Sequence, residues 1–344
     1  MTPRERTMTA LNREKPDRCP MQVDITPEFA VRLGDRLGEV FLDQDLVMAS
    51  AGWANNYYRD LDEYTDDWGV GWRKVEYSTR FGKGFYTEIV GHPLADDKAI
   101  DSYRPPDPTV PGLYEEPRRI IEEFGSDHYV TGVVVCTLFE TAWALRGFER
   151  TLVDLVSDPD LAGRLLDIPY GYHLAAARKL VEMGVDMIWL GDDVGMQTGM
   201  MFRPELWRRL FKPRMAGIIA ELKGMNPALK IAYHSDGNIL PIVPDLIEIG
   251  VDVLNPVQPA CMDPAAVKKE FGDRLCFWGT IDEQYTLPFG TPEQVRAEVL
   301  TRLRTVGSGG GLIIGPTHNV QLDTPLENFW AMWDAIKNTP YSSL

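Results

Sequence analysis

Short runs of apolar and β-branched residues alternate along this chain with longer stretches in which apolar residues recur at helical spacing. The short runs predict seven strands, at residues 21–24, 129–136, 187–191, 230–234, 251–256, 275–280 and 311–315. Thr2-Pro3, Thr291-Pro292 and Thr324-Pro325 mark helix starts, each with a Glu or Gln at the third helical position. Strand and helix in repeated alternation close most simply into a parallel (β/α)8 TIM-type barrel.

One stretch, residues 27–125, is too long to be a simple connection between strands. Within it, residues 75–77 and 85–87 flank the turn Phe81-Gly82-Lys83-Gly84, which predicts a β-hairpin. The sequence has no linker, repeat or low-complexity tract that would mark a domain boundary. We therefore expect a single domain over residues 1–344, in which residues 27–125 form a helical and hairpin insertion over the barrel mouth.

Composition narrows the classes of function. The 344 residues are 44% hydrophobic and 25% charged, which is typical of a globular protein. The formal net charge of −16 argues against a nucleic-acid or anionic-membrane partner, because both require a basic surface. The sequence has neither a membrane-length apolar stretch nor a signal-like start, so we expect a cytoplasmic protein. The four cysteines are widely spaced, which predicts neither a disulfide framework nor a zinc ribbon.

Residues 233–238, which read Tyr-His-Ser-Asp-Gly-Asn, are the most informative part of the chain. They follow a predicted strand, and side chains two residues apart on a strand point to the same face. His234 and Asp236 would therefore project together, as a metal or acid/base site. The alternative interpretation is a hydrogen-bonded histidine followed by an ordinary Asp-Gly-Asn turn.

If the chain is a barrel, its chemistry belongs at the carboxyl ends of the strands and in the loops that follow them. Polar and thiol side chains do gather after the predicted strands. They are Asp24, Cys136, Glu140, Asp192, Asp193, Gln197, His234, Asp236, Asn255, Gln258, Cys261, Asp282, Glu283 and His318. The other three histidines, His92, His128 and His173, fall elsewhere in the pattern, and we interpret them as structural.

Further motifs extend over most of the chain. They are Arg13-Glu14-Lys15-Pro16-Asp17-Arg18, Gly184-Val185-Asp186, Gly191-Asp192-Asp193, Phe202-Arg203-Pro204-Glu205-Leu206-Trp207, Phe211-Lys212-Pro213, residues 233–238, residues 250–258 and Gly315-Pro316-Thr317-His318. Together they resemble the uroporphyrinogen decarboxylase superfamily. That superfamily contains tetrapyrrole decarboxylases and metal-dependent, cobamide-linked methyltransferases, so the resemblance implies the barrel fold and leaves the reaction open.

The segment after the first predicted strand favours the methyltransferase branch. The decarboxylase acts on a substrate with many carboxylates and carries an Arg-rich segment of the Arg-x-Ala-Gly-Arg-Tyr kind at this place. This chain has Met21-Gln22-Val23-Asp24-Ile25-Thr26-Pro27 instead, with an aspartate and no arginine. A polyanionic substrate would be repelled there.

The resemblance also implies a metal site. The methyltransferases place a His-x-Cys pair where His234 and Asp236 stand here, and a second cysteine where His318 stands. The implied metal set is therefore His234, Asp236 and His318, with Cys261, from the loop after the next strand, as a fourth member. Catalytic zinc sites usually keep three protein ligands and one open position.

Replacing two thiolates by a carboxylate and an imidazole leaves a bound Zn²⁺ with net positive charge, which suits oxygen chemistry. We therefore expect a methoxylated small molecule, for example an aromatic ether, as methyl donor in an O-demethylation. The chain lacks the Asp-x-His-x-x-Gly corrinoid-binding signature. A separate corrinoid protein would therefore supply the cobamide and dock near the insertion.

The remaining roles follow from position in the chain. Asp193 is expected to position or protonate the leaving oxygen, or else to cap the next helix. The expected substrate contacts are Asp24, Phe139, Glu140, Met196, Gln197, Asn255 and Gln258. Two alternatives stay open, a metal-free decarboxylase and a binding protein that keeps the barrel without turnover. A homodimer also stays open, because the sequence does not separate a dimer face from the core.

Overall fold

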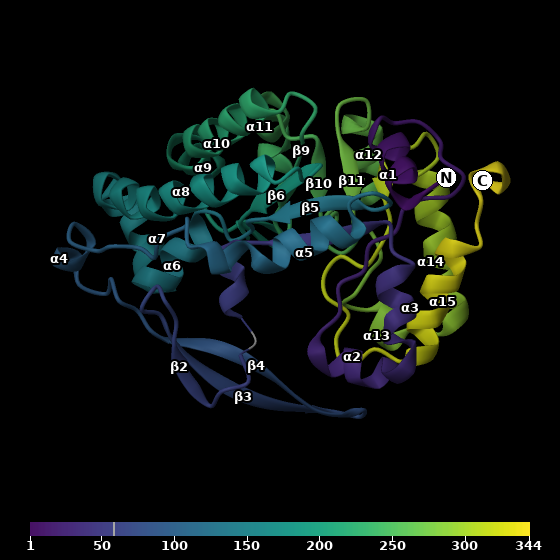
Figure 1. The fold of residues 1–344 in the computed structure, drawn as a ribbon, viewed down its shortest axis with the longest axis horizontal. Coiled ribbons are helices and arrows are strands. Elements are labelled where there is room, and N and C mark those ends of the chain that lie inside the picture. The colour runs from purple at the N-terminus through teal and green to yellow at the C-terminus, as the bar shows by residue number, and fades with distance from the viewer. Residues whose placement is uncertain (58) are drawn as a thin grey trace.

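Seven parallel strands form the curved sheet at the centre of the molecule (Figure 1). The computed structural model describes residues 1–57 and 59–344. In sheet order the strands are β1 Leu46–Ser50, β5 Tyr129–Val133, β6 Met187–Gly191, β9 Lys230–His234, β10 Val253–Asn255, β11 Cys276–Trp278 and β12 Leu312–Ile313. Each strand pairs with the next one along the chain in this series, so the predicted TIM-type barrel is confirmed.

The first position of the barrel is held by an irregular segment. We predicted a strand at residues 21–24, but the chain makes only single parallel bridges there, from Met21 to Ile314 and from Ile25 to Val320. The carbonyl oxygen of Met21 also accepts a hydrogen bond of 3.0 Å from the backbone N–H of Asp45, at the start of β1. The segment therefore lies between β12 and β1 and closes the barrel.

The sequence pattern missed β1. This strand lies inside residues 27–125, so that stretch is not purely an insertion: residues 46–50 pair with β5, from Leu46↔Tyr129 to Ser50↔Val133. The five residues Leu-Val-Met-Ala-Ser include good helix formers and follow two short helices, which hides the strand. The part that leaves the barrel begins only after Ser50.

Helices surround the sheet (Figure 1). They are α1 Pro3–Leu11, α2 Pro27–Leu33, α3 Leu37–Leu42, α6 Phe139–Arg146, α7 Phe148–Ser157, α8 Pro159–Glu182, α9 Pro204–Leu210, α10 Lys212–Met225, α11 Val243–Glu248, α12 Pro264–Phe271, α13 Thr286–Phe289, α14 Pro292–Thr305 and α15 Leu326–Lys337. The capping boxes predicted at Thr2 and Thr291 are confirmed. The one at Thr324 is wrong, because α15 begins after Pro325 and has no side-chain cap. Within the described part of the chain, no helix has the length and apolarity of a membrane span.

Between β1 and β5 the chain forms a separate ribbon and two helices (Figure 1). These elements are β2 Glu63–Thr65, β3 Gly71–Thr79, β4 Gly82–Gly91, α4 Asp97–Ile100 and α5 Glu115–Phe124. The antiparallel pairing of β3 with β4 confirms the predicted hairpin. At its tip, Arg80 donates to the carbonyl of Pro288 at 3.4 Å, and the Phe81 ring lies 4.0 Å from the Arg32 guanidinium. The tip therefore rests on α13 and α2, which follow the carboxyl ends of barrel strands.

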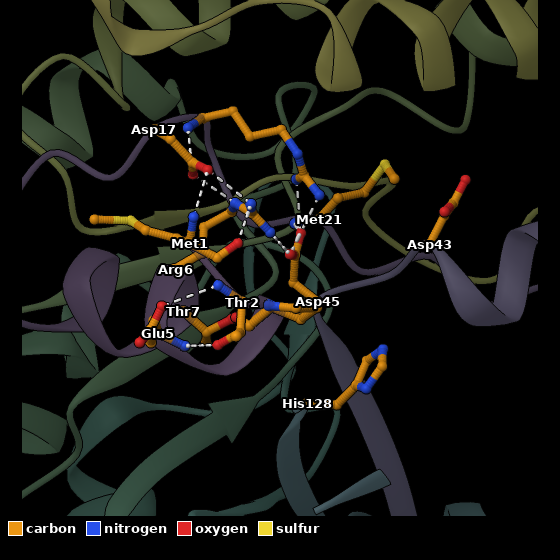
Figure 2. Close-up of polar contacts among 12 residues, drawn as sticks. Met1, Thr2, Glu5, Arg6, Thr7, Asp17, Met21, Asp43, Asp45 and His128 are labelled. Atoms are coloured by element: carbon orange, nitrogen blue, oxygen red, sulfur yellow. Dashed lines mark hydrogen bonds and ion pairs between the residues drawn. The ribbon is translucent and has the colours of Figure 1, made fainter. Parts of the chain in front are cut away.

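The amino end of the barrel is closed by α1 and a cluster of ion pairs (Figure 2). Arg6 pairs with Asp45 and with Asp17, each at 2.6 Å, and Arg18 pairs with Asp45 at 2.7 Å. The second oxygen of Asp45 also accepts the backbone N–H of Met21 at 2.7 Å. Buried Asp45 thus joins the irregular first segment to β1, and both of its oxygens are satisfied.

Candidate functional site

A cavity of about 430 Å³ opens at the carboxyl ends of the barrel strands. Its lining residues are Gln22, Asp24, Ala54, Tyr57, Val135, Cys136, Glu140, Trp189, Asp193, His234, Asn255, Pro316, Thr317, His318 and Asn319. Among the described residues, the lining contains carboxylates and imidazoles but neither lysine nor arginine. Trp189 packs against Trp278 in the barrel interior, with ring centroids 4.6 Å apart and the ring planes tilted by 44°. The cavity therefore joins an aromatic floor to an acidic wall.

Asp193, His234 and Asp236 form the centre of the site. One ligand-type atom from each residue lies within 4.8 Å of the others. His234 ends β9, and its Nε2 lies 3.4 Å from Asp193 Oδ1, in the loop after β6. The same Asp193 oxygen accepts the backbone N–H of Asp236 at 2.7 Å. Two neighbouring strands thus bring one imidazole and two carboxylates together.

The backbone at Gly191 allows this close approach. Gly191 ends β6 with φ +130° and pairs with His234, and a Cβ atom there would collide with the His234 backbone. Only glycine combines such a conformation with such crowding. A side chain at this position would push the ends of β6 and β9 apart and separate Asp193 from His234.

Asn255 fixes the orientation of the His234 ring. Its Oδ1 lies 2.7 Å from His234 Nδ1, and its amide nitrogen donates to the carbonyl of Trp278 at 3.3 Å. Because the amide oxygen can only accept, Nδ1 must be the donor. His234 Nε2 then points toward Asp193 and, in the neutral ring, carries the lone pair that a metal ligand requires.

The charges at the centre are incompletely compensated. Burial raises the pKa of Asp236, and the charge of Asp193 adds to this rise, while His234 and His318 oppose it. The Oδ1 atom of Asp236 is buried and has no hydrogen-bond partner in the part of the chain that the structure describes. Burial alone would lower the pKa of His234, but the charges of Asp193 and Asp236 and the bond to Asn255 outweigh it, so the pKa is raised. A bound cation would relieve both imbalances.

Further carboxylates line the wall of the cavity. Burial raises the pKa of Asp24, although Gln22 and the two histidines His318 and His234 work against the rise. Burial, followed by the charge of Asp193, raises the pKa of Glu140 well above its usual value. Glu140 Oε2 accepts the backbone N–H of Asp193 at 3.1 Å. The predicted residues Asp24 and Glu140 therefore do face the cavity.

Asp192, and not its neighbour Asp193, caps a helix, and this helix is α6 rather than the next helix along the chain. Its carboxylate accepts the backbone N–H groups of Leu138 and Glu140, at 2.8 and 3.1 Å, at the start of α6. Burial nevertheless raises the pKa of Asp192 to about 7. Asp193 is thereby left to face His234 and Asp236.

His318 and Cys261 lie near the centre but outside the group of three. The His318 ring lines the cavity, and its centroid is 6.3 Å from that of His234. The sulfur of Cys261 faces Gln197 Oε1 at 3.4 Å and Gln258 Oε1 at 3.6 Å. Burial raises the pKa of the Cys261 thiol, and the charge of Asp236 is the second largest cause. Cys261 thus contacts two glutamines and does not line the cavity.

Four predicted substrate contacts do not line the cavity. Phe139 is fully buried in the outer core, with its ring 5.4 Å from that of Phe202. Met196 is 50% exposed, and Gln197 bonds to Gln284 across the rim. Gln258 accepts the backbone N–H of Gly237, in the turn after His234. Gln258 therefore supports the site from outside, whereas Asn255 lines it as predicted.

Trp189 and Tyr57 line the cavity and were not predicted. Trp189 lies on the same face of β6 as Met187 and Gly191, because alternate residues of a strand share a face. Strand alternation could therefore have found Trp189. Tyr57 comes from the irregular connection after β1, where no periodic pattern exists to place it.

The fold and the cavity together define a TIM-barrel protein with an acidic, histidine-bearing site at the carboxyl end. Residues 68–339 match the family model for uroporphyrinogen decarboxylase (URO-D), and the chain belongs to this family. This confirms the resemblance seen in the sequence.

Relatives of this chain include methyltransferases and decarboxylases. A methylcobamide:CoM methyltransferase, MtaA, of Methanosarcina barkeri is 26% identical over 225 residues, 65% of this chain and 62% of that protein. A uroporphyrinogen decarboxylase of Psychromonas ingrahamii is 26% identical over 192 residues, 52% of this chain and 49% of that one. Both matches span less than two thirds of the relative's own length.

A solved structure described as a methyltransferase from Methanosarcina mazei has the same fold along the whole chain. Its TM-score is 0.73, with 98% of this chain and 99% of that chain covered at 21% identity. At this identity the likeness shows the barrel fold alone. The reaction has to be argued from the site.

Proposed function

We propose that this protein is a metal-dependent methyltransferase that moves a methyl group between a small methoxylated molecule and the corrinoid of a separate protein. The observation that carries the proposal is the half-buried group Asp193, His234 and Asp236, set in a cavity whose lining, among the described residues, holds neither lysine nor arginine. The methylcobamide:CoM methyltransferase among the relatives supports the reaction class.

The residues present fit a divalent metal. His234 Nε2 and the unpartnered Oδ1 of Asp236 are donors of the right type, and Asp193 lies within reach of both. His318 lines the same cavity, and Cys261 is the outermost candidate. A Zn²⁺ ion held here would supply Lewis acidity that draws charge from an ether oxygen.

The protein's own residues account for binding and orientation. The indole of Trp189 forms an apolar floor suited to a flat ring, and Tyr57 adds a second aromatic surface. Asn255 holds the His234 ring in one orientation through its Nδ1 atom. Glu140, whose pKa burial raises, holds a proton at the cavity wall beside Asp193, where a leaving oxygen could take it up.

The charge of the cavity disfavours a decarboxylase. A substrate with many carboxylates needs cationic partners, yet among the described residues the lining contains Asp24 and Asp193 and neither arginine nor lysine. A neutral ether meets no such repulsion. The two alternative functions, a decarboxylase and a binding protein without turnover, can therefore be distinguished from methyl transfer by experiment.

A direct assay supplies Zn²⁺-loaded protein with guaiacol or veratrole and with free cob(I)alamin as the methyl acceptor. We expect methylcobalamin absorbance to appear, and His234→Ala to slow its formation by at least about a hundredfold. Methyl thioethers and methylamines serve as comparison donors, and uroporphyrinogen tests for release of CO₂. Absence of methyl transfer from every donor, or CO₂ release from uroporphyrinogen, would contradict the proposal.

A further inference from the structure

The irregular first segment of the barrel, residues 20–26, has backbone pairing on one side only. Toward the end of β12 and the loop that follows it, backbone hydrogen bonds of 2.8 to 3.2 Å join the segment to Ile314 and Val320. Toward β1, in the described part of the chain, no backbone hydrogen bond joins it to residues 46–50. Neighbouring parallel strands are normally joined by evenly spaced backbone bonds. The wall of the barrel therefore lacks its ladder between this segment and β1.

Side chains from the residues just before β1 take the place of the missing ladder. Oε1 of Gln44 accepts the backbone N–H of Val23 at 2.7 Å. Oδ2 of Asp45 accepts the backbone N–H of Met21, also at 2.7 Å (Figure 2). Both acceptors precede the first residue of β1. The seam between the segment and β1 is thus fastened at its amino end and has no backbone bonds along the strand.

A cavity of about 500 Å³ lies at this seam, between residues 22–25, β1 and the helix α5. Val47 and Met48 both line it, although successive residues of a strand face opposite sides of a sheet. Met48 packs against the interior cluster of the barrel, whereas Val47 packs against the outer core. This lateral cavity therefore extends into the wall of the barrel rather than lying on its outer surface.

The lateral cavity adjoins the candidate site. Gln22 and Asp24 line both the lateral cavity and the cavity at the carboxyl ends of the strands. Oε1 of Gln22 accepts the indole N–H of Trp278 at 3.1 Å, which holds this side chain toward the barrel interior. The two spaces therefore meet at Gln22 and Asp24.

The lining of the lateral cavity suits a small neutral molecule. Apolar side chains form much of its wall, namely Ile25, Phe41, Ile120 and Phe124. The outer rim on α5 carries Glu116, Arg119 and Glu123, and Asp24 lies at the inner end, so carboxyl groups predominate and an anion is disfavoured. Apolar walls with a few polar groups, in a cavity of this size, are typical of small-molecule sites. A flat aromatic ether or phenol has the matching chemistry.

We propose that the lateral cavity is the route by which the small methyl donor enters the reaction site and its demethylated product leaves. The inference rests on the proposed function for the identity of the molecule. A corrinoid that takes up the methyl group must itself reach the reaction site, and its carrier protein covers the barrel mouth while it does so. Small molecules then exchange through the seam instead of waiting for the carrier protein to dissociate.

Ile120→Trp tests the route, because Ile120 is half-buried on α5, lines the lateral cavity and does not line the reaction cavity. Leu152→Trp is a matched control. Leu152 is half-buried on α7 and lines a different outer cavity, which shares no lining residue with the reaction cavity. Exchange of 4-fluoroguaiacol with the Zn²⁺-loaded protein, without any corrinoid, is measured from ¹⁹F NMR line shapes.

An obstruction on a route raises the barrier to entry and exit equally and leaves the bound state unchanged. In Ile120→Trp we therefore expect the association and dissociation rate constants to fall together, by at least about fivefold, with Kd within about twofold of the wild type. Leu152→Trp should change neither rate constant. Ile120→Ala, which widens the lateral cavity, should raise both rate constants at least about twofold, and it carries the test if the larger side chain is not accommodated.

Three results would overturn the proposal. The first is unchanged exchange rates in the folded Ile120 variants. The second is equal slowing by Ile120→Trp and Leu152→Trp, which would reduce the effect to a general loss of packing. The third is a wild-type protein that does not bind 4-fluoroguaiacol. Binding with the expected rate changes, but without methyl transfer, would reject only the proposed reaction and retain the route.

Discussion

The two ends of this barrel hold buried charge in opposite ways. At the amino end, Asp45 is fully buried and pairs with Arg6 and Arg18, so every charge has a partner (Figure 2). At the carboxyl end, Asp236 and Glu283 each bury an oxygen that has none. The first arrangement stabilises the fold. The second is unfavourable until something positive binds, which is the physical signature of a binding site.

The amino-end cluster should be the more costly to disturb. Asp45→Asn leaves Arg6 and Arg18 without their shared carboxylate, and we expect it to lower the free energy of unfolding by about 3 kcal/mol. Urea denaturation in the presence of a chelator measures this. Glu39→Gln, which breaks an exposed pair with Arg36, is the control and should cost less than about 1 kcal/mol. Altered Zn²⁺ affinity in Asp45→Asn would show that the two ends are not independent.

His173 differs from the buried carboxylates at both ends of the barrel, because it is buried without a charge. Its Nε2 accepts the backbone N–H of Trp53 at 3.1 Å, its Nδ1 faces the carbonyl of Pro169, and burial lowers its pKa to about 4. The unfolded chain therefore binds a proton at higher pH than the folded one does. Stability should be constant above pH 6.5 and fall between pH 6.5 and 4, by up to about 3 kcal/mol.

The matched variant for this effect is His173→Gln, which keeps one acceptor and one donor but does not titrate. Urea midpoints measured from pH 8 to pH 4 should decline more steeply in the wild type than in the variant. Parallel pH profiles would mean that His173 is not held neutral in the folded protein. The hydrogen bond from the Trp53 backbone N–H would then not fix the protonation state of the ring.

The carboxyl end should respond to the same type of change with the opposite sign. Asp236→Asn removes an uncompensated charge, so the metal-free protein should gain about 1 kcal/mol of stability at pH 8. Because burial raises the folded-state pKa of Asp236, this gain should shrink as the pH falls and the wild type takes up a proton. Zn²⁺ should stabilise the wild type and not the variant. If the substitution instead destabilises the metal-free protein, the charge of Asp236 is compensated within the fold, as that of Asp45 is.

Sequence patterns predicted the barrel because its core strands obey simple rules. The bounds of β6 and β9 match the predicted strands at residues 187–191 and 230–234, where apolar runs end in glycine or in a polar turn. The pattern failed at residues 21–24, where the Asp45 side chain accepts the Met21 N–H and regular backbone pairing is missing, and at residues 46–50, a short strand that includes good helix formers. A segment that is held in place by a buried carboxylate has no periodic hydrophobic pattern from which a strand could be predicted.

The site could be predicted where it depends on strand ends and not where it depends on loops. His234, Asp236 and Asn255 follow from their strand positions, and the structure brings His234 and Asp236 together. Asp193 was predicted as a proton carrier, yet it lies within the same ligand group. Tyr57 comes from an irregular connection, whose conformation is set by tertiary contacts.

Metal analysis of anaerobically purified protein, wild type against His234→Ala, is the simplest test of the proposed metal centre. We expect about one equivalent of zinc in the wild type and less than about a tenth in the variant, because His234 Nε2 and Asp236 would supply the inner ligands. Wild-type protein with less than about a tenth of an equivalent of zinc and intact methyl transfer would contradict it.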